Sequence, residues 1–184
     1  AGVACEQAAM FDDLPANLVP ARALGMTTIW LKSDAPWGKH GPMMEVAPGD
    51  IDYVVLSHLH FDHAGNLKLF AETNARLVCS AKEKEWAFGF DGPFNGAHLK
   101  ADYQGLDFET VDGDAEFLPG ISFIQTPGHT PGSMSMRVDL PEAGTMIFTA
   151  DAVYMGASYG PPAVPAAIVN NLEQWYSSVE KLRG

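Results

Sequence analysis

Four residues of the kinds that bind metal ions lie within a stretch of six: His58, His60, Asp62 and His63. Imidazole nitrogens and carboxylate oxygens are common protein ligands of zinc and related divalent ions. A solvated loop without a ligand is the alternative explanation. The whole chain has 6 histidines, and three of them fall within these six residues, which argues against that alternative. The spacing therefore predicts a metal site.

The position of this cluster directly after an apolar run indicates how its side chains are aimed. Side chains at alternate positions of an extended segment point in the same direction, which places His58 and His60 together. The turn that follows brings Asp62 and His63 round to a neighbouring direction. One loop can thus serve two ions a few ångströms apart, and we expect a dinuclear site.

The elements that must position these ligands are short strands and helices. Runs rich in β-branched and aromatic residues, or alternating in polarity, predict strands at 52–57, 75–79, 106–111, 121–125, 133–138 and 145–149. Helices are predicted at 83–88 and at 171–182, the second capped by Asn170 or Asn171. Strands separated by helices indicate an α/β layered fold.

Composition limits the class of protein. The 184 residues, 47% of them hydrophobic, suit one domain over residues 1–184. A formal net charge of -12 disfavours nucleic acid as a partner, and no apolar run is as long as a membrane span. Two cysteines, Cys5 and Cys79, are too few for a disulfide framework, and Cys79 is expected to be a buried thiol. We expect a cytoplasmic protein whose partner is a small-molecule substrate; the oligomeric state, a homodimer included, stays open.

The sequence resembles the metallo-β-lactamase superfamily of hydrolases, whose H-x-H-x-D-H signature is matched by residues 58–63. The segment 126–133, TPGHTPGS, is similar to the family's next metal-ligand turn and presents His129. The segment 149–152, TADA, is similar to the place of the bridging carboxylate, here Asp151. Each of these two motifs alone is weak, because such residues are more often structural, as a turn histidine or a helix cap. In this order the three motifs are specific, and they imply an αβ/βα sandwich.

The resemblance also implies a ligand set. His58, His60 and His129 hold the first ion, Asp62 and His63 hold the second, and Asp151 bridges them. The implied cofactors are two divalent metal ions, with zinc preferred and iron or cobalt left open. The flavodiiron oxidoreductases of the same fold place a glutamate where this chain has His60, so a hydrolase is favoured.

One ligand of the family pattern has no counterpart. Members with a dinuclear site carry another histidine near the C-terminal end, whereas no histidine follows His129. The family's opening strands also have no counterpart in this sequence. In the family a turn follows these strands, and Ala1-Gly2 resembles the end of that turn. We expect a segment of a longer protein, with N- and C-terminal parts missing and a further histidine beyond Gly184.

The expected chemistry is hydrolysis by an activated water. Two divalent ions sharing a water lower its pKa enough to supply hydroxide near neutral pH, so no serine or cysteine nucleophile is required. Asp62 can accept the proton of that water and return it to the leaving group. A role for Asp62 as a metal ligand or a supporting residue only is equally open.

Within the superfamily the motifs most resemble the N-acyl homoserine lactonase, or quorum-quenching, branch. There a tyrosine three residues after the bridging aspartate hydrogen-bonds the lactone, and Tyr154 occupies that place. An ordinary half-buried aromatic residue is the alternative for Tyr154, and Phe61 is open between pocket wall and core. Candidate acyl-chain contacts are 26–31, Trp37 with Met43-Met44, and 159–165, although such segments more often serve packing.

Other functions remain as alternatives. A thioesterase of the glyoxalase II type, or another ester or carbon-halide hydrolase of the superfamily, can use the same ions. A true β-lactamase is the least favoured enzyme, and a nuclease is disfavoured by the net charge of -12. A metal-stabilised binding domain without activity is disfavoured because every ligand position visible in this segment is retained.

Overall fold

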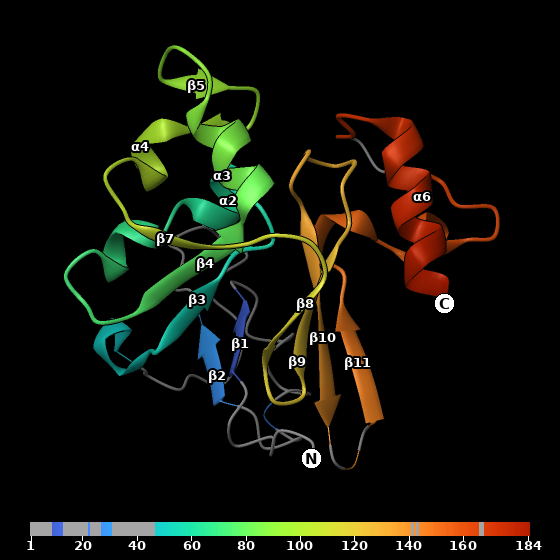
Figure 1. The fold of residues 1–184 in the computed structure, drawn as a ribbon, viewed down its shortest axis with the longest axis horizontal. Coiled ribbons are helices and arrows are strands. Elements are labelled where there is room, and N and C mark those ends of the chain that lie inside the picture. Colours follow the sequence, from blue (N-terminus) through green and yellow to red (C-terminus); the bar gives the residue numbers. More distant parts are fainter. Residues whose placement is uncertain are drawn as a thin grey trace.

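Two sheets of different type form the framework of the molecule. The computed structural model describes residues 9–12, 22, 27–30, 47–140, 142, 144–165 and 168–184, and the two sheets lie side by side in it (Figure 1). The first is parallel, in the order β3-β4-β7, with bounds Tyr53–Val55, Arg76–Ser80 and Phe108–Val111. The second is antiparallel, in the order β11-β10-β9-β8, with bounds Gly144–Phe148, Met134–Leu140, Ile121–Gln125 and Ala115–Leu118.

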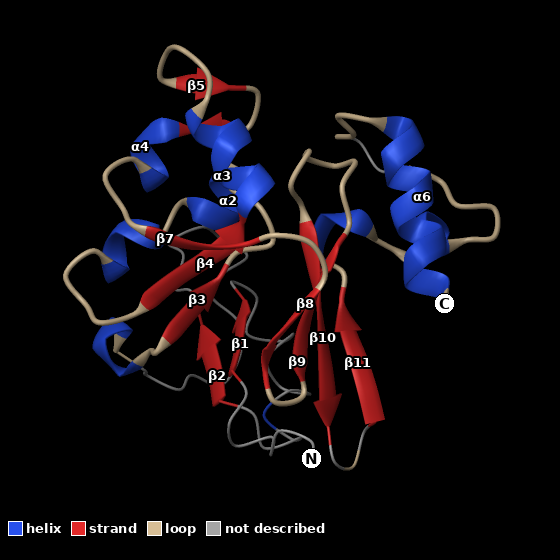
Figure 2. Ribbon diagram, in the orientation of Figure 1, coloured by secondary structure: helices blue, strands red, loops and turns tan. Residues whose placement is uncertain are grey.

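Smaller elements surround these sheets. The described strands also form a parallel pair, β1 (Ala9–Asp12) with β2 (Thr27–Trp30), and a short hairpin, β5 (Phe94–Asn95) with β6 (His98–Leu99). The described α-helices are α2 (Phe61–Ala64), α3 (Ala81–Phe88), α4 (Lys100–Tyr103), α5 (Gly156–Tyr159) and α6 (Leu172–Arg183). Single turns of 3-10 helix lie at Pro48–Asp50, Leu67–Phe70 and Ala150–Ala152. Helices α2, α3 and α4 gather beside the first sheet and α6 beside the second (Figure 2).

Strand β4 shows how the layers are held together. Parallel strands buried on both faces are typical of sheets covered on each side. Leu77 and Cys79 of β4 point into the apolar cluster beneath the helices, whereas Val78 packs on the opposite face against Phe123 and Met134 of the second sheet. The first sheet therefore lies between its helices on one face and the second sheet on the other.

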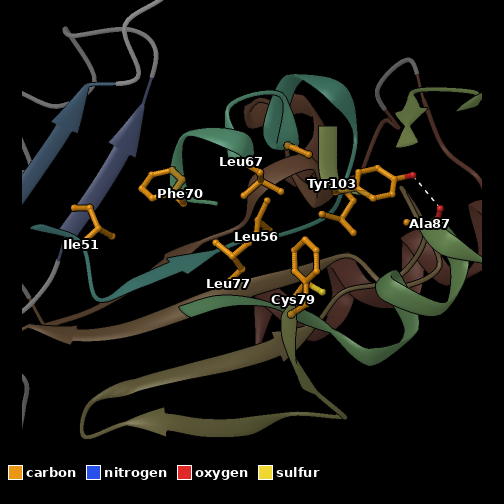
Figure 3. Close-up of a cluster of buried hydrophobic side chains, with 11 residues drawn as sticks. Ile51, Leu56, Leu67, Phe70, Leu77, Cys79, Ala87 and Tyr103 are labelled. Atoms are coloured by element: carbon orange, nitrogen blue, oxygen red, sulfur yellow. Dashed lines mark hydrogen bonds between the residues drawn. The ribbon is translucent and has the colours of Figure 1, made fainter. Parts of the chain in front are cut away.

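The larger apolar cluster lies between the first sheet and its helices (Figure 3). Tyr103 is fully buried in it, and its hydroxyl donates to the carbonyl of Ala87 at 2.9 Å. Burial raises the pKa of Tyr103 to about 12 and that of the Cys79 thiol to about 12 as well. Cys79 is thus a buried, protonated thiol, as the sequence predicts.

The predicted elements are confirmed, with differences at their ends. All six predicted strands and both predicted helices are present. Helix α3 begins at Ala81 because the Ser80 hydroxyl accepts from the backbone nitrogen of Glu83, and α6 is capped by the Asn171 side chain. Strand β8 was not predicted; its run is short and its pairing with β9 is irregular between Glu116 and Leu118.

Some predictions fall outside the described part of the chain. Ala1-Gly2, Cys5, Trp37 and Met43-Met44 lie there, so they stay predictions. In the described ranges, no helix combines the length and the hydrophobicity that crossing a bilayer requires.

Candidate metal centre

The loop after β3 directs the side chains of its first two histidines, His58 and His60, to the same side. The Leu56 nitrogen donates to the Val78 carbonyl, and the Ser57 carbonyl accepts from Met134 at the start of β10, which fixes the loop between the two sheets. Leu59 is fully buried in the apolar cluster, so its neighbours His58 and His60 point the other way. The predicted alternation is therefore confirmed.

Three imidazoles converge on one point. His129 Nε2 lies 3.2 Å from His58 Nε2 and 3.0 Å from His60 Nδ1. Ligands at roughly 2.0 to 2.1 Å around a tetrahedral zinc ion lie about 3.3 Å from one another, so these separations match a shared ion. All three side chains are buried. The donor set fits a divalent metal, as the resemblance implies.

The electrostatic setting keeps the imidazoles of His58 and His60 neutral, the state in which an imidazole binds metal. Burial, reinforced by His63 and the other nearby imidazoles, lowers the pKa of His58 well below its usual value. Burial, together with His98 and His129, lowers the pKa of His60 to about 4. Metal binding at neutral pH then requires no proton to leave these two rings.

A second group of ligands shares His58 with the first and adds His63 and Asp151. Asp151 Oδ1 lies 3.3 Å from His63 Nε2, while its Oδ2 lies 3.2 Å from His129 Nε2. The two carboxylate oxygens thus face different histidines, and the bridging role of Asp151 stays a prediction. Burial acts to raise the pKa of Asp151, but hydrogen bonds from His63 and Tyr154 outweigh it and hold this pKa below its usual value.

Asp62 lies at the rim of the site. Its side chain is 55% exposed, and its Oδ2 lies 3.8 Å from His63 Nε2. Neither group of converging ligands in the described residues includes Asp62. Its roles as a ligand and as a proton carrier stay predictions.

Tyr154 reaches the site from the turn after Asp151. Its hydroxyl donates to Asp151 Oδ2 at 2.6 Å, and its ring centroid lies 6.0 Å from that of His129. Burial and the carboxylate of Asp151 raise the pKa of Tyr154, so the hydroxyl is a donor at neutral pH. Phe61 is 54% exposed at the start of α2, so it is not a core residue.

Two glycines in the turn that carries His129 pack closely against neighbouring helices. A Cβ on Gly128, whose φ is +136°, would lie 2.4 Å from the Trp175 Cα of α6. A Cβ on Gly132 would lie 2.0 Å from the Glu83 nitrogen of α3. The His129 Nδ1 pairs with the Ile168 carbonyl at 2.7 Å, which leaves Nε2 free to face the other histidines.

The sequence does not reveal the contacts of three residues that lie beside the candidate ligands. The Ser57 hydroxyl lies 3.1 Å from His58 Nδ1 and 3.4 Å from His63 Nδ1. Glu83 and His98 form a buried pair at 2.8 Å behind the site. The pattern Ser80-x-x-Glu83 signals a helix start, but nothing in it reveals that the Glu83 carboxylate turns away from the cap and into the protein.

A layered α/β fold that gathers histidines and a carboxylate at the ends of strands is characteristic of metallohydrolases. The chain belongs to the metallo-β-lactamase superfamily, whose family model matches residues 36–184. The mixed α/β arrangement described above is accordingly the metallo-β-lactamase fold, as predicted.

Similar proteins include several lactonases. The chain is 32% identical over 146 residues to the N-acyl homoserine lactonase AttM of Azorhizobium caulinodans, covering 75% of this chain and 54% of that protein. It is 35% identical over 107 residues to the N-acyl homoserine lactonase AiiA of Bacillus thuringiensis subsp. kurstaki, covering 58% of this chain and 40% of that protein. The chain thus spans about half the length of the curated relatives it matches.

A comparison with solved structures also finds an N-acyl homoserine lactone hydrolase. This hydrolase, with the product N-hexanoyl-L-homoserine bound at its catalytic metal centre, matches with a TM-score of 0.65 at 30% identity. The match covers 74% of this chain and 51% of that one. AidC, a dizinc quorum-quenching lactonase, matches at 21% identity, which supports the fold alone.

Proposed function

We propose that this chain carries the metal centre of a dinuclear hydrolase that opens the ring of N-acyl homoserine lactones. The observation that carries the proposal is the convergence of His58, His60 and His129 on one point, with His63 and Asp151 gathered beside His58. The relatives at 32 to 35% identity, which are N-acyl homoserine lactonases, support the choice of substrate.

The residues present would hold two divalent ions, with zinc as the first candidate. His58, His60 and His129 would hold the first ion, Asp62 and His63 the second, and Asp151 would bridge them. When bound, such a pair lowers the pKa of a shared water and polarises a carbonyl group. The mixed nitrogen and oxygen donor set, which contains no thiolate, is compatible with zinc.

The protein's own groups supply proton transfer and orientation. Asp62, exposed at the rim, accepts the proton of the attacking water and passes it to the alkoxide that leaves when the ring opens. Tyr154, protonated at neutral pH, turns its hydroxyl from Asp151 to the lactone oxygen that gains negative charge. Phe61, exposed beside the ligand loop, provides apolar contact to the substrate.

A substrate panel tests the proposal. The zinc-loaded protein is assayed by proton release on short- and long-chain N-acyl homoserine lactones, thioesters, carboxylic esters, alkyl halides and a β-lactam, with Asp151→Ala as the inactive control. We expect turnover of the lactones to exceed that of every other class. Faster turnover of a thioester, ester or halide reassigns the enzyme to that reaction, and a fully metallated protein without any turnover points to a binding domain.

A further inference from the structure

A buried carboxylate behind the ligands contacts both loops that form the first half of the centre. Glu83, in the first turn of α3, is fully buried. Its Oε1 accepts from the Leu59 backbone nitrogen at 2.9 Å, and its Oε2 accepts from the Thr130 hydroxyl at 2.5 Å. Leu59 lies between His58 and His60, and Thr130 directly follows His129. One side chain therefore joins the segments that supply all three converging imidazoles.

The same carboxylate also contacts His98, whose ring packs against His60. Oε1 of Glu83 pairs with His98 Nε2 at 2.8 Å. The His98 ring packs edge-on against His60, with centroids 4.5 Å apart and planes at 75°. His98 comes from the β5–β6 hairpin, which is also tied to the ligand loop where the Phe61 nitrogen donates to the Ala97 carbonyl. A third segment is thus fixed by the same residue.

The contacts around Glu83 suit a carboxylate. The Leu59 nitrogen and the Thr130 hydroxyl donate to Glu83, and His98 Nε2 faces the same carboxylate, which offers acceptor positions on both oxygens and no donor. A glutamine of the same shape replaces one oxygen with an NH₂ group. The Thr130 hydroxyl can rotate to accept from this group, but the contacts around Glu83 then offer no acceptor for the hydroxyl hydrogen or for the second amide hydrogen. An unmatched buried polar group is costly, so the loops would have to separate.

We propose that Glu83 is a positioning residue that sets the spacing of the first metal's three histidines through Leu59, Thr130 and His98. The inference rests on the metal centre of the proposed function. Groups that orient metal ligands typically change metal affinity by about tenfold to a hundredfold when replaced. The effect should be largest for the first ion, because His58, His60 and His129 are the ligands whose segments Glu83 joins.

Zinc affinity and a cobalt spectrum test this role without reference to activity. Stripped protein is titrated with Zn²⁺ against a chromophoric chelator, and its Co²⁺ form is examined by visible absorption, for wild type, Glu83→Gln and the control Glu85→Gln. Glu85 lies on the same helix but is exposed. We expect Glu83→Gln to bind zinc about tenfold to a hundredfold more weakly, with shifted cobalt bands, and Glu85→Gln to match wild type.

A second pair of variants keeps the test decisive if Glu83→Gln does not fold. Thr130→Val removes one of the three hydrogen bonds with almost no change in volume, and Thr130→Ser restores the hydroxyl. We expect a smaller shift in zinc affinity and cobalt bands for the valine variant, with recovery by serine. Wild-type affinity and spectrum in folded Glu83→Gln, or in Thr130→Val when the glutamine variant is unfolded, overturn the positioning role alone. A wild type that binds no zinc overturns the proposed function as well.

Discussion

Removing the hydroxyl of Tyr154 separates catalysis from metal binding. The hydroxyl donates to Asp151 Oδ2 at 2.6 Å, and the residue is 46% exposed. Tyr154→Phe therefore deletes one polar atom at the surface of the site and leaves no buried cavity. Asp151 keeps its closest approaches to His63 and His129, at 3.3 and 3.2 Å, so the carboxylate stays in place for metal binding.

The size of the effect follows from what the hydroxyl does in the transition state. A hydrogen bond to a charged group, such as the oxygen that gains charge in the transition state, contributes about 1.5 to 3 kcal/mol. Each 1.4 kcal/mol corresponds to about a factor of ten in rate. We expect Tyr154→Phe to lower kcat for a lactone by about tenfold to a hundredfold at unchanged metal content.

The assay combines steady-state lactone hydrolysis with elemental analysis of the same sample. Tyr176→Phe is the matched control, because Tyr176 is similarly exposed, at 41%, but lies on α6. Unchanged kcat in Tyr154→Phe would refute the catalytic role and leave the tyrosine as a partner of Asp151. A loss of metal in parallel with the loss of rate would show that the hydroxyl acts by holding the carboxylate.

Three further predictions concern metal content, packing and pH. Asp151→Ala should lose bound metal as well as rate, because it removes the carboxylate whose two oxygens face His63 and His129; elemental analysis checks this. Gly132→Ala should lower the free energy of unfolding by about 3 kcal/mol or prevent folding, since its Cβ would lie 2.0 Å from the Glu83 nitrogen; denaturant unfolding measures it. The metal-free protein should lose thermal stability as the pH falls from about 6.5 to about 4, because His58 and His60 take up protons in the unfolded chain before they do so when folded.

Each of these predictions has an outcome that contradicts it. Full metal content in Asp151→Ala would exclude the bridging role. Gly49→Ala is the packing control, because a Cβ on Gly49 meets nothing within 4 Å, and equal stability losses in the two glycine variants would contradict the close approach at Gly132. A thermal midpoint that does not change between pH 6.5 and 4 would mean that the two imidazoles are already accessible to protons in the folded state.

The first three candidate ligands could be predicted from the sequence because their signal is local. His58, His60 and His63 lie within six residues after a strand, and strand geometry alone places the first two together. The positions of His129 and Asp151 came from the order of motifs in the family, since neither residue is distinctive alone. The structure brings both beside the first cluster, with nitrogen and oxygen atoms 3.0 to 3.3 Å apart.

The supporting residues could not be predicted, because their roles depend on contacts between distant parts of the chain. Glu83 is 24 residues from Leu59 and 47 from Thr130. Its sequence context predicts a helix start, and the Ser80 hydroxyl does cap α3. A charged residue near a helix start is normally exposed, and only the folded structure shows three polar groups meeting this carboxylate in the interior.

The two glycines beside His129 show how one local pattern can have two different physical causes. The sequence TPGHTPGS predicts a tight turn, and Gly128 with a φ of +136° meets that expectation. Gly132 has no such backbone requirement; it is needed because the start of α3 packs directly against it, where the Ser80 hydroxyl also donates to the Gly132 carbonyl at 2.5 Å. The His129 turn is therefore clamped between α6 and α3. Helix α3 contributes Glu83 to the same junction, so the packing that excludes a side chain at position 132 also holds the carboxylate against the ligand loops.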